Sequence, residues 1–349
     1  MSMAVVFRCD VGSGVGLGHL MRCREMARFL TGEGVDCAMV GPEPSWGCEA
    51  DEALFAIWEP VATRSSAQED ARRVTDLCSR MGARHAVIDD YRADPDFQKT
   101  LRAHGLRWLQ QFDASTDWRF CCDVLVNASP YEQRGEYLHR LDNPAGTETL
   151  FGPAFAVVRP AFRDVALRGD GRPVRRILVG FGGGDDRGAV ALAVEALAGS
   201  LGPDVRLVVV SGKDNPRRSA IEAALHALPE GQAELHVAPD DMAGLMAGCD
   251  LAVIGGGTMS YEAAICGLPT VLVSLAANQE NPCRGWQALS GAVWLGQVGQ
   301  VDKETLFQAV SSLVSDGSRR RDMAARGRAA VDGKGVERLA VALLEGNSG

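Results

Sequence analysis

DLAVIGGGTMSYEAAICGLPTVLVSLAANQ, residues 250–279, is the stretch that decides the fold. Its apolar run, Leu251 to Ile254, meets three glycines, and helical spacing follows from Met259 to Cys266. Gly267 then ends the helix, and Pro269 precedes the next apolar run. The pattern predicts a strand, a glycine turn, a short helix and a second strand, which together form a unit of a parallel α/β sheet.

The glycine turn predicts an anion site. In a parallel sheet the turn lies at the carboxyl edge, and the amides around Gly256, Gly257 and Thr258 are the unpaired donors of a helix start. One helix terminus contributes about 0.3 to 2 kcal/mol toward binding an anion, whereas micromolar binding needs about 8 kcal/mol. Other groups must therefore hold the rest of the ligand.

Three polar residues near this turn are candidates for that role. Glu262, one turn into the helix, is placed to accept hydrogen bonds from two sugar hydroxyls. Asn278 and Gln279, at the end of the next strand, are placed to contact a neutral polar ligand. The alternative is a tight structural turn in which Glu262 is a solvated helix residue.

The composition is that of an ordinary globular protein. The chain has 349 residues, of which 46% are apolar and 23% charged, and this length suits two domains of about 150 to 180 residues each. No apolar run approaches the roughly 20 residues that span a bilayer, and the start, MSMAVVFRCD, lacks a basic leader. We therefore expect a cytoplasmic protein without membrane insertion.

The cysteines, the net charge and one acidic motif argue against a disulfide framework, a nucleic-acid partner and a metal site. The ten cysteines are scattered without a C-x-x-C pair, which indicates reduced and mostly buried thiols. The net charge of -9 disfavours a nucleic-acid partner, and we interpret the basic run Arg319 to Arg321 as a solvated helix face. Asp94 and Asp96 form a D-x-D in a proline turn, which is more typical of a helix start than of a metal pair. We expect no metal and no cofactor.

The first expected strand, residues 3–9, leads directly into a glycine loop. Four glycines lie in this loop: Gly12, Gly14, Gly16 and Gly18. The loop does not match G-x-G-x-x-G, because position 17 is Leu and position 19 is His, and no Walker lysine follows. It instead presents one imidazole, His19, at the carboxyl edge of the sheet, where it can accept a proton. The alternative is that His19 caps the turn without a chemical role.

Polar residues also follow a later strand, at residues 86–88. Asp89, Asp90 and Tyr91 stand at its carboxyl end, where acidic and phenolic groups can face a ligand cleft or cap the following turn. A further strand, residues 177–181, runs into a second glycine loop that includes Gly183. The substrate contacts expected from these carboxyl-edge segments are Asp10, Gly16, Gly18, Asp90 and Gly183.

Two domains follow from these repeated units. Loss of periodicity and a gain of Gly, Pro and charge mark a linker near residues 164–174. We expect domains at residues 1–165 and 172–335, and a last amphipathic helix at 336–349 that packs back across the domain seam. The expected fold class is α/β, with two doubly wound Rossmann-like domains and a ligand cleft between them.

Taken in order, six segments resemble the PseG/SpsG group of sugar-nucleotide enzymes. They read FRCDVGSGVGLGHLMRC, IDDYRAD, LFGPAFAVVRPAF, ILVGFGGGDD, DDMAGLMAGCDLAVIGGGTMSYEAAICGLP with LAANQ, and VDGKGVERL. The G-x-G-H-x-x-R-C block, together with G-G-G-T-x-x-x-E and N-Q, is the specific part. That group is related to the glycosyltransferase MurG, so the resemblance implies the MurG-like GT-B architecture.

The resemblance also implies an activity. The best-known member type hydrolyses UDP-2,4-diacetamido-2,4,6-trideoxy-β-L-altropyranose to UDP and free sugar, on the way to pseudaminic acid and flagellin glycosylation. By position, His19 is the implied base that activates water at the anomeric carbon, and Tyr91 and Asn278 help to place the sugar. The second domain is expected to hold UDP, with the glycine-turn amides on the pyrophosphate and Glu262 on the ribose.

Two departures from the group bear on the sugar rather than on the fold. Many relatives carry an acidic pair after the strand near Leu109, where this chain reads QQFD at residues 110–113. Tyr261 precedes the helix glutamate in GGGTMSYE, which is closer to the SpsG side of the group.

Three functions fit these residues. A UDP-sugar hydrolase is our first expectation. The second is a GT-B glycosyltransferase in which an acceptor hydroxyl replaces water, although the sequence lacks an evident membrane-docking patch for a lipid acceptor. The third is a catalytically idle sugar-nucleotide-binding subunit, against which His19 counts. The sequence leaves the oligomeric partner open.

Overall fold

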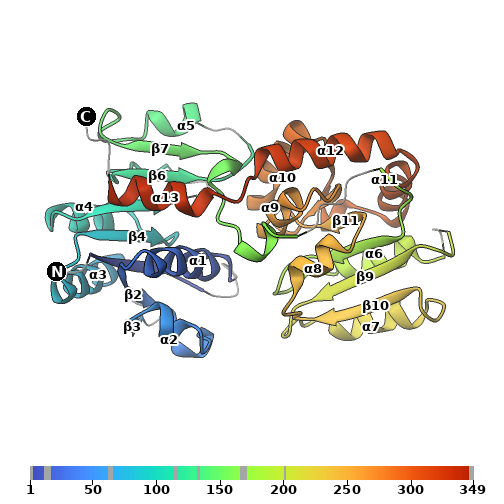
Figure 1. Cartoon of the computed structure of the whole chain (residues 1–349), viewed down its shortest axis with the longest axis horizontal. Helices are drawn as coiled ribbons and strands as arrows, with labels where there is room; N and C mark the ends of the chain where they lie inside the picture. Colours follow the sequence, from blue (N-terminus) through green and yellow to red (C-terminus); the bar gives the residue numbers. More distant parts are fainter. Residues whose placement is uncertain are drawn as a thin grey trace. The chain divides into compact units, whose positions relative to one another are not determined.

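The computed structural model describes residues 3–11, 17–61, 66–112, 117–131, 134–165, 171–199 and 202–345. The chain divides into two compact units, each built on one sheet with helices on its faces (Figure 1). Unit 1 comprises residues 1–128, 132–158 and 334–349, and unit 2 comprises residues 129–131 and 159–333. The α/β class and the two doubly wound sheets expected from the sequence are confirmed.

The described part of unit 1 holds a seven-stranded parallel sheet in the order β3-β2-β1-β4-β5-β6-β7. Its strands are β1 (Ala4–Cys9), β2 (Asp36–Gly41), β3 (Ile57–Pro60), β4 (His85–Asp89), β5 (Arg107–Gln111), β6 (Val124–Asn127) and β7 (Glu148–Phe151). Its helices are α1 (Gly18–Gly32), α2 (Asp51–Leu54), α3 (Ala67–Met81), α4 (Pro95–Ala103), α5 (Arg134–Leu138) and α13 (Gly335–Leu344), with 3-10 turns η1 (Pro44–Trp46) and η2 (Pro153–Phe155). The chain order reverses between β1 and β4, and ligands of open α/β sheets bind at the carboxyl ends beside such a reversal.

Alternation along β1 builds a core on each face of this sheet. Val5 and Phe7 face a cluster that α1 and α13 cover, whereas Val6 faces a second cluster with α3 and α4. Arg8 is fully buried, and its Nη2 lies 2.6 Å from Asp70 Oδ2. A guanidinium is tolerated in this interior because carboxylates neutralise it.

The last helix, α13, belongs to unit 1, where it contacts α1 and β5 (Figure 1). Arg107, at the start of β5, donates to the carbonyl oxygens of Ala342 and Leu343 at 2.8 and 2.9 Å. These carbonyls belong to the last turn of α13 and have no acceptor role within the helix, so the arginine satisfies them. The chain thus returns to its first sheet after completing unit 2.

The described part of unit 2 holds a six-stranded parallel sheet in the order β10-β9-β8-β11-β12-β13. Its strands are β8 (Arg176–Gly180), β9 (Arg206–Ser211), β10 (Ala233–Val237), β11 (Leu251–Ile254), β12 (Thr270–Ser274) and β13 (Val293–Gln297). Its helices are α6 (Ala189–Leu197), α7 (Arg218–His226), α8 (Met242–Ala247), α9 (Thr258–Ile265), α10 (Glu280–Ser290), α11 (Lys303–Ser315) and α12 (Gly317–Ala330), with 3-10 turns η3 (Pro160–Phe162), η4 (Ala277–Gln279) and η5 (Val298–Gln300). Here the order reverses between β8 and β11, which are the strands that precede the two glycine loops of this unit.

The expectation that Arg319 to Arg321 form a solvated helix face is wrong for Arg320, the central residue of this run at the start of α12. Arg320 is 4% exposed, and its guanidinium donates to the carbonyl oxygens of Leu313 and Val314 in the last turn of α11. It also donates to the carbonyls of Gly171 and Arg172, at 3.2 and 2.6 Å. Arg320 therefore caps a helix end and fixes the segment before β8.

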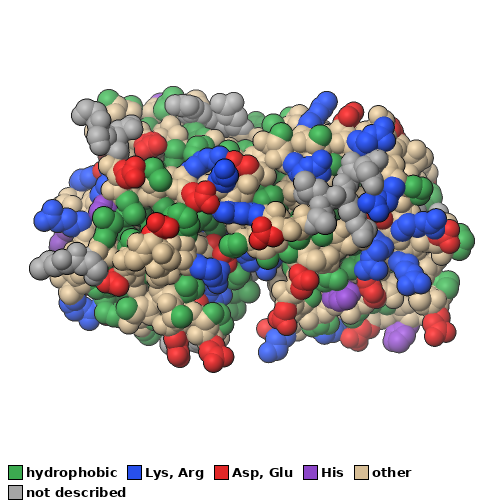
Figure 2. All heavy atoms as spheres, in the orientation of Figure 1, with side chains coloured by type: hydrophobic (Ala, Val, Ile, Leu, Met, Phe, Trp, Pro, Cys, Tyr) green, Lys and Arg blue, Asp and Glu red, His purple; other side chains and the backbone are tan. Residues whose placement is uncertain are grey.

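The structure also bears on the expectations for the D-x-D turn at Asp94 and Asp96 and for the cysteine thiols. Asp94 caps α4 by accepting from the amides of Asp96 and Phe97, as the helix-start interpretation predicts. Most cysteines are buried, while Cys48 is exposed. Figure 2 shows basic and acidic side chains interspersed over the face in view. Among the described residues, no helix combines the length and the apolar character needed to cross a membrane.

Candidate functional site

The carboxyl edge of unit 1 brings His19, Arg22 and Asp89 together. His19 is 3% exposed in the first turn of α1, and its Nδ1 lies 2.7 Å from the carbonyl oxygen and 2.9 Å from Oδ1 of Asp89. Arg22 donates to both carboxylate oxygens of Asp89, each at 2.8 Å. A spacing of three residues puts His19 and Arg22 on one face of α1, toward the end of β4. Gly18 begins α1, and Gly16 lies outside the described residues.

These contacts fix the tautomer of His19. Both oxygens near Nδ1 are acceptors, so Nδ1 carries the proton in the neutral ring and Nε2 carries the lone pair. The Asp89 carboxylate orients the imidazole as the acid of a catalytic His–Asp pair does. The ring therefore bonds across to β4, and the geometry suits proton acceptance at Nε2.

The charge on Asp89 is stabilised despite its burial. Burial alone raises the pKa of this carboxyl group, but attraction to Arg22 and His19 and the hydrogen bonds they donate outweigh burial. The pKa of Asp89 consequently lies well below its usual range. The carboxylate is therefore ionised at neutral pH, where it holds the His19 ring.

Tyr91 packs against the His19 ring. The two ring centroids lie 4.6 Å apart with an interplanar angle of 85°, an edge-to-face arrangement. Phe112, which follows β5, meets Tyr91 edge-on in turn, with centroids 6.5 Å apart. The structure thus brings together two of the three residues expected to act on the sugar, and aromatic contacts limit the rotation of both rings.

Asp10 and Asp90 belong to a separate ionic network. Asp90 is 3% exposed, its Oδ2 lies 2.8 Å from Arg8 Nη2, and its Oδ1 accepts from the Arg92 amide at 2.8 Å. Arg92 Nη2 lies 3.3 Å from Asp10 Oδ2. Neighbouring residues of a strand point to opposite faces, which explains why Asp89 and Asp90 have different partners. Asp90 thus caps the turn and neutralises Arg8, while the substrate roles of Asp10 and Asp90 stay predictions.

In unit 2 the glycine turn between β11 and α9 is packed tightly. A Cβ on Gly256 would lie 2.4 Å from Cys283 Sγ, so the position requires glycine. Gly257 is the N-cap residue of α9 and has no capping side chain within the described chain. The Ser260 amide donates to the Gly257 carbonyl at 2.9 Å, and the two amides before it, beginning at the exposed Thr258, precede any helical acceptor. These donors stand beside the reversal between β8 and β11, where an anion is expected.

Gln279 lies over the same turn. Its Oε1 accepts from the Leu275 amide at 3.0 Å, and its Nε2 is 3.6 Å from where a Cβ on Gly257 would stand. The side-chain amide is therefore held with its donor end near the start of α9. Asn278, in the same 3-10 turn, is exposed. Gln279 is thus placed to add a donor to the expected anion site.

Glu262 is not a solvated helix residue, which corrects one interpretation from the sequence. It is 5% exposed, and its Oε1 accepts from Arg159 Nε at 3.1 Å and from Arg159 Nη2 at 2.7 Å. Arg159 also stacks over the Phe162 ring, with its guanidinium carbon 4.8 Å from the ring centroid. The ion pair neutralises Glu262 and holds its carboxylate in place on α9.

Gly183 lies in the exposed loop after β8 and touches the neighbouring loop after β9. A Cβ on Gly212 would lie 1.9 Å from the Gly183 carbonyl oxygen, so the two backbones approach closely. Asp186 joins the same loops, because its carboxylate accepts from Asn215 Nδ2 and from the Gly188 amide, both at 2.6 Å. The loop at this switch point therefore has a defined shape.

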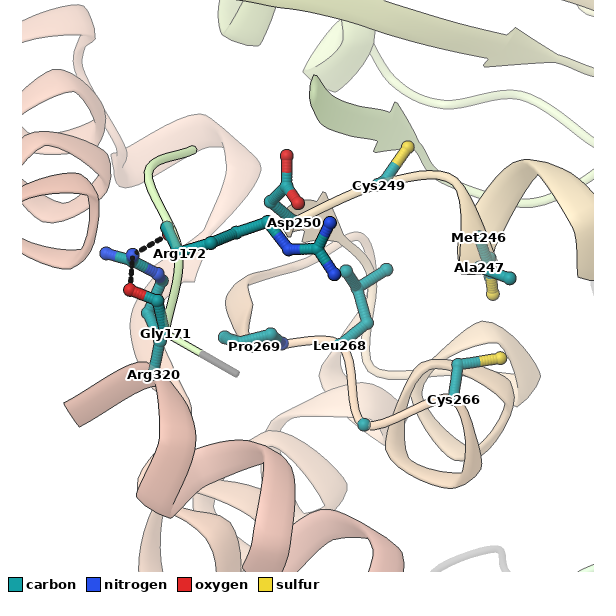
Figure 3. A pocket seen from close by; sticks show the side chains of 11 residues that line it. Gly171, Arg172, Met246, Ala247, Cys249, Asp250, Cys266, Leu268, Pro269 and Arg320 are labelled. Atoms are coloured by element: carbon teal, nitrogen blue, oxygen red, sulfur yellow. Dashed lines mark hydrogen bonds between the residues drawn. The ribbon is translucent and has the colours of Figure 1, made fainter. Parts of the chain in front are cut away.

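A hollow in unit 2 lies at the opposite edge of the sheet (Figure 3). It is lined by Asp250 and Pro269, which precede β11 and β12, and by the Arg320 and Arg172 side chains. Figure 3 shows Arg320 bonded to the carbonyls of Gly171 and Arg172. The hollow has room for about one water molecule. We therefore assign the candidate site to the carboxyl edges and not to this hollow.

Three contacts of the site were not predicted from the sequence. Asp89 holds His19, Arg22 donates to Asp89, and Arg159 donates to Glu262. Arg22 had an available signal, because it stands three residues after His19 inside the GHLMRC segment. Arg159 lies 103 residues before Glu262, and no local pattern joins the two.

Comparison with known proteins gives two informative sequence relatives, while no protein-family model matches. Spore coat polysaccharide biosynthesis protein SpsG from Bacillus subtilis is 30% identical over 218 residues, which cover 60% of this chain and 62% of SpsG. The match therefore spans less than two thirds of that relative. UDP-2,4-diacetamido-2,4,6-trideoxy-β-L-altropyranose hydrolase from Campylobacter jejuni is 22% identical over 299 residues, covering 85% of this chain and 97% of the hydrolase.

The fold is shared with solved structures. Acinetobacter baumannii MurG superposes with a TM-score of 0.70, covering 99% of this chain and 100% of the MurG chain at 15% identity. At that identity the likeness shows the fold alone. The chain is a distant homologue of SpsG and of the PseG-type UDP-sugar hydrolase, and it has the MurG-like GT-B fold.

Proposed function

We propose that the chain hydrolyses a UDP-linked 2,4-diacetamido-2,4,6-trideoxyhexose to UDP and free sugar, in a pathway of the pseudaminic-acid type. The observation that carries this proposal is the His19–Asp89 pair at the switch point of unit 1. Distant homology to a hydrolase of such a nucleotide sugar supports the substrate class. In this reaction the base acts on water, so no second organic substrate is needed.

The reaction needs one base and one stabilised leaving group. His19 Nε2 takes a proton from water, the water oxygen bonds to the anomeric carbon, and the bond from that carbon to the β-phosphate oxygen breaks with its electron pair leaving on UDP. A positioned base of this kind contributes about 10² to 10⁴ in rate. Tyr91, in edge contact with His19, and Asn278 are the proposed sugar-positioning residues.

Unit 2 is the proposed UDP-binding unit. Negative charge develops on the pyrophosphate as the bond breaks, and the α9 amides with Gln279 Nε2 are donors suited to stabilise it. Glu262 is the proposed ribose ligand, held by Arg159. A buried carboxylate that is already oriented loses little freedom when it accepts from ribose hydroxyls.

The test is an incubation without acceptor. Purified protein is mixed with UDP-2,4-diacetamido-2,4,6-trideoxy-β-L-altropyranose, and products are separated and identified by mass spectrometry. The proposal expects UDP and free sugar in equal amounts. Unchanged substrate that nevertheless binds would instead support an idle binding subunit, and turnover that requires an added hydroxyl acceptor would support a transferase.

A glycosyltransferase is the second candidate. Leu17 precedes α1 and is 41% exposed, and Trp46 follows β2 and is 45% exposed. Both stand at the carboxyl edge of the unit 1 sheet that carries His19. An apolar acceptor would cover these side chains, and the incubation above separates this candidate from the hydrolase.

A further inference from the structure

Gln111 stands next to the His19–Asp89 pair in the sheet of unit 1. It is the last residue of β5, and Leu109, two residues earlier, belongs to the core cluster on the α1 face. The register pairs Ile88 of β4 with Gln110 of β5, so the next pair along the two strands is Asp89 with Gln111. Paired residues of parallel strands share a face and lie about 4.8 Å apart. Gln111 is therefore the strand neighbour of the carboxylate that holds His19.

The side chain of Gln111 is mostly buried, and its amide has no partner among the described residues. The side chain belongs to a residue that is 8% exposed, and it makes no hydrogen bond to any other residue that the structure describes. Gln110, by contrast, faces the other side, where its Oε1 accepts from Trp108 Nε1. Gln98 is fully buried and uses both ends of its amide, donating to the Ala93 carbonyl and accepting from the Cys121 amide. Gln110 and Gln98 thus each use at least one end of the amide within unit 1, whereas Gln111 uses neither end among the described residues.

The location of this amide points to a ligand. A side-chain amide offers two donors and two acceptor lone pairs. Its two polar atoms are not among the fully buried side-chain atoms that lack a hydrogen-bond partner in the described chain, whereas Gln110 Nε2 is one of them. Gln111 can therefore still be reached from solvent at the edge that carries His19. An amide that is mostly covered and has no partner among the described residues gains hydrogen bonds when a polar ligand binds beside it.

We propose that Gln111 is a specificity-determining residue that binds an N-acyl substituent of the sugar. Its Nε2 donates to the acyl carbonyl oxygen, and its Oε1 accepts from the N–H of the same amide. A carboxylate at this position would accept only, and it would favour an ammonium group over an acylated nitrogen. The inference rests on the proposed function in one respect: it takes the sugar to lie at the edge that carries His19.

The experiment compares ligands that differ only in acylation. The ligands are UDP, the UDP-2,4-diacetamido-trideoxyaltrose and its two monoamino counterparts, in which one acetamido group is a free amine. Gln111→Met keeps the shape and removes the hydrogen bonds, and Gln111→Glu replaces the donor with a second acceptor oxygen and adds a negative charge. Gln68→Met, on the exposed side of α3, is the matched control. Dissociation constants are measured by calorimetry in a His19→Ala background, so that no ligand is consumed.

The expected result is a change in ligand preference without a change in UDP binding. In Gln111→Met, the preference for one acetamido group over its amine should fall about 3- to 10-fold, as expected for the loss of a neutral hydrogen bond. Gln111→Glu should move the preference toward that amine, and the control should match the parent. Equal preferences in all variants, with unchanged thermal stability, would overturn the assignment. Failure of hydrolysis in the wild type would remove the proposed reaction but would leave this binding comparison decisive.

Discussion

His19 Nδ1 lies 2.9 Å from Asp89 Oδ1, and Arg22 donates to both oxygens of the same carboxylate. The two donors come from successive turns of α1, and Asp89 ends β4. One carboxylate therefore joins helix to strand and fixes the proton on Nδ1. In the proposed reaction Asp89 acts through His19, so it is a positioning residue.

Replacing Asp89 should slow turnover without weakening UDP binding. Asp89→Asn keeps the size of the side chain, but its amide cannot serve as the same charged acceptor for His19 and Arg22. We expect kcat to fall about 10²-fold or more, because the ring loses its orientation and its tautomer. Asp96→Asn, at an exposed position of α4, is the control. Wild-type kcat in Asp89→Asn would remove Asp89 from the mechanism.

Acid should destabilise the protein partly through Asp89. The folded pKa of this carboxyl is lowered, whereas the unfolded chain binds its proton near a pKa of about 3.9. The contribution to stability is therefore present above that unfolded pKa and is lost as pH falls toward the folded pKa. Urea unfolding between about pH 6 and pH 2.5 should show a smaller loss for Asp89→Asn than for the wild type. An equal loss of stability in the two proteins would contradict the assignment of Asp89 as an ionised carboxylate in the folded state.

His19 should matter for chemistry and not for nucleotide affinity. His19→Ala is expected to lower kcat by about 10² to 10⁴, the contribution of a positioned base. Its dissociation constant for UDP should stay near the wild-type value, because the proposed UDP ligands are in unit 2. His104→Ala, at an exposed position after α4, controls for a general effect of losing an imidazole. A His19→Ala protein with wild-type kcat would exclude this base.

The ribose role of Glu262 is best tested with the ligand. Wild type should bind UDP about 10-fold or more tightly than 2′,3′-dideoxy-UDP, because hydrogen bonds to a charged acceptor are lost with the hydroxyls. Glu262→Ala should bind both nucleotides equally. Arg159→Met should lie between the two, since it frees the carboxylate without removing it. If Glu262→Ala still prefers UDP, the ribose is bound by other residues.

The glycine turn offers a matched pair of substitutions. Gly256→Ala should weaken UDP binding and lower the thermal midpoint, because its Cβ would meet Cys283 Sγ at 2.4 Å. Gly257→Ala should be milder, since the nearest atom, Gln279 Nε2, lies at an ordinary 3.6 Å. Adding Cys283→Ala should restore part of the loss in Gly256→Ala. Equal effects of the two single changes would show that close packing is not the cause.

The interior strands of both sheets could be predicted because their apolar runs are buried on two sides. Leu251 to Ile254 is fully buried, and its pattern is plain in the sequence. The edge strands β3 and β13 were not predicted, because most of their residues are only half-buried and their short apolar runs do not distinguish a strand from a helix. Edge strands take their structure from a neighbour, which sequence order does not reveal.

The site was predictable where chemistry is local and not where partners are distant. His19 and the glycine turn could be predicted because the residues next to them in the sequence already indicate a helix start after a strand. Asp89 and Asp90 look equivalent in the sequence, and only the faces of β4 assign one to His19 and the other to Arg8. Glu262 is buried and paired with Arg159, a residue that comes from far along the chain.

The central claim is that water, activated by His19, attacks the anomeric carbon of a UDP-sugar. Turnover of the diacetamido UDP-sugar in ¹⁸O-labelled water, with mass spectrometry of both products at early times, tests it most directly. Attack at carbon predicts UDP that carries no heavy oxygen and free sugar that carries one. Heavy oxygen in the β-phosphate of UDP, or no release of UDP at all without an acceptor, would contradict the claim.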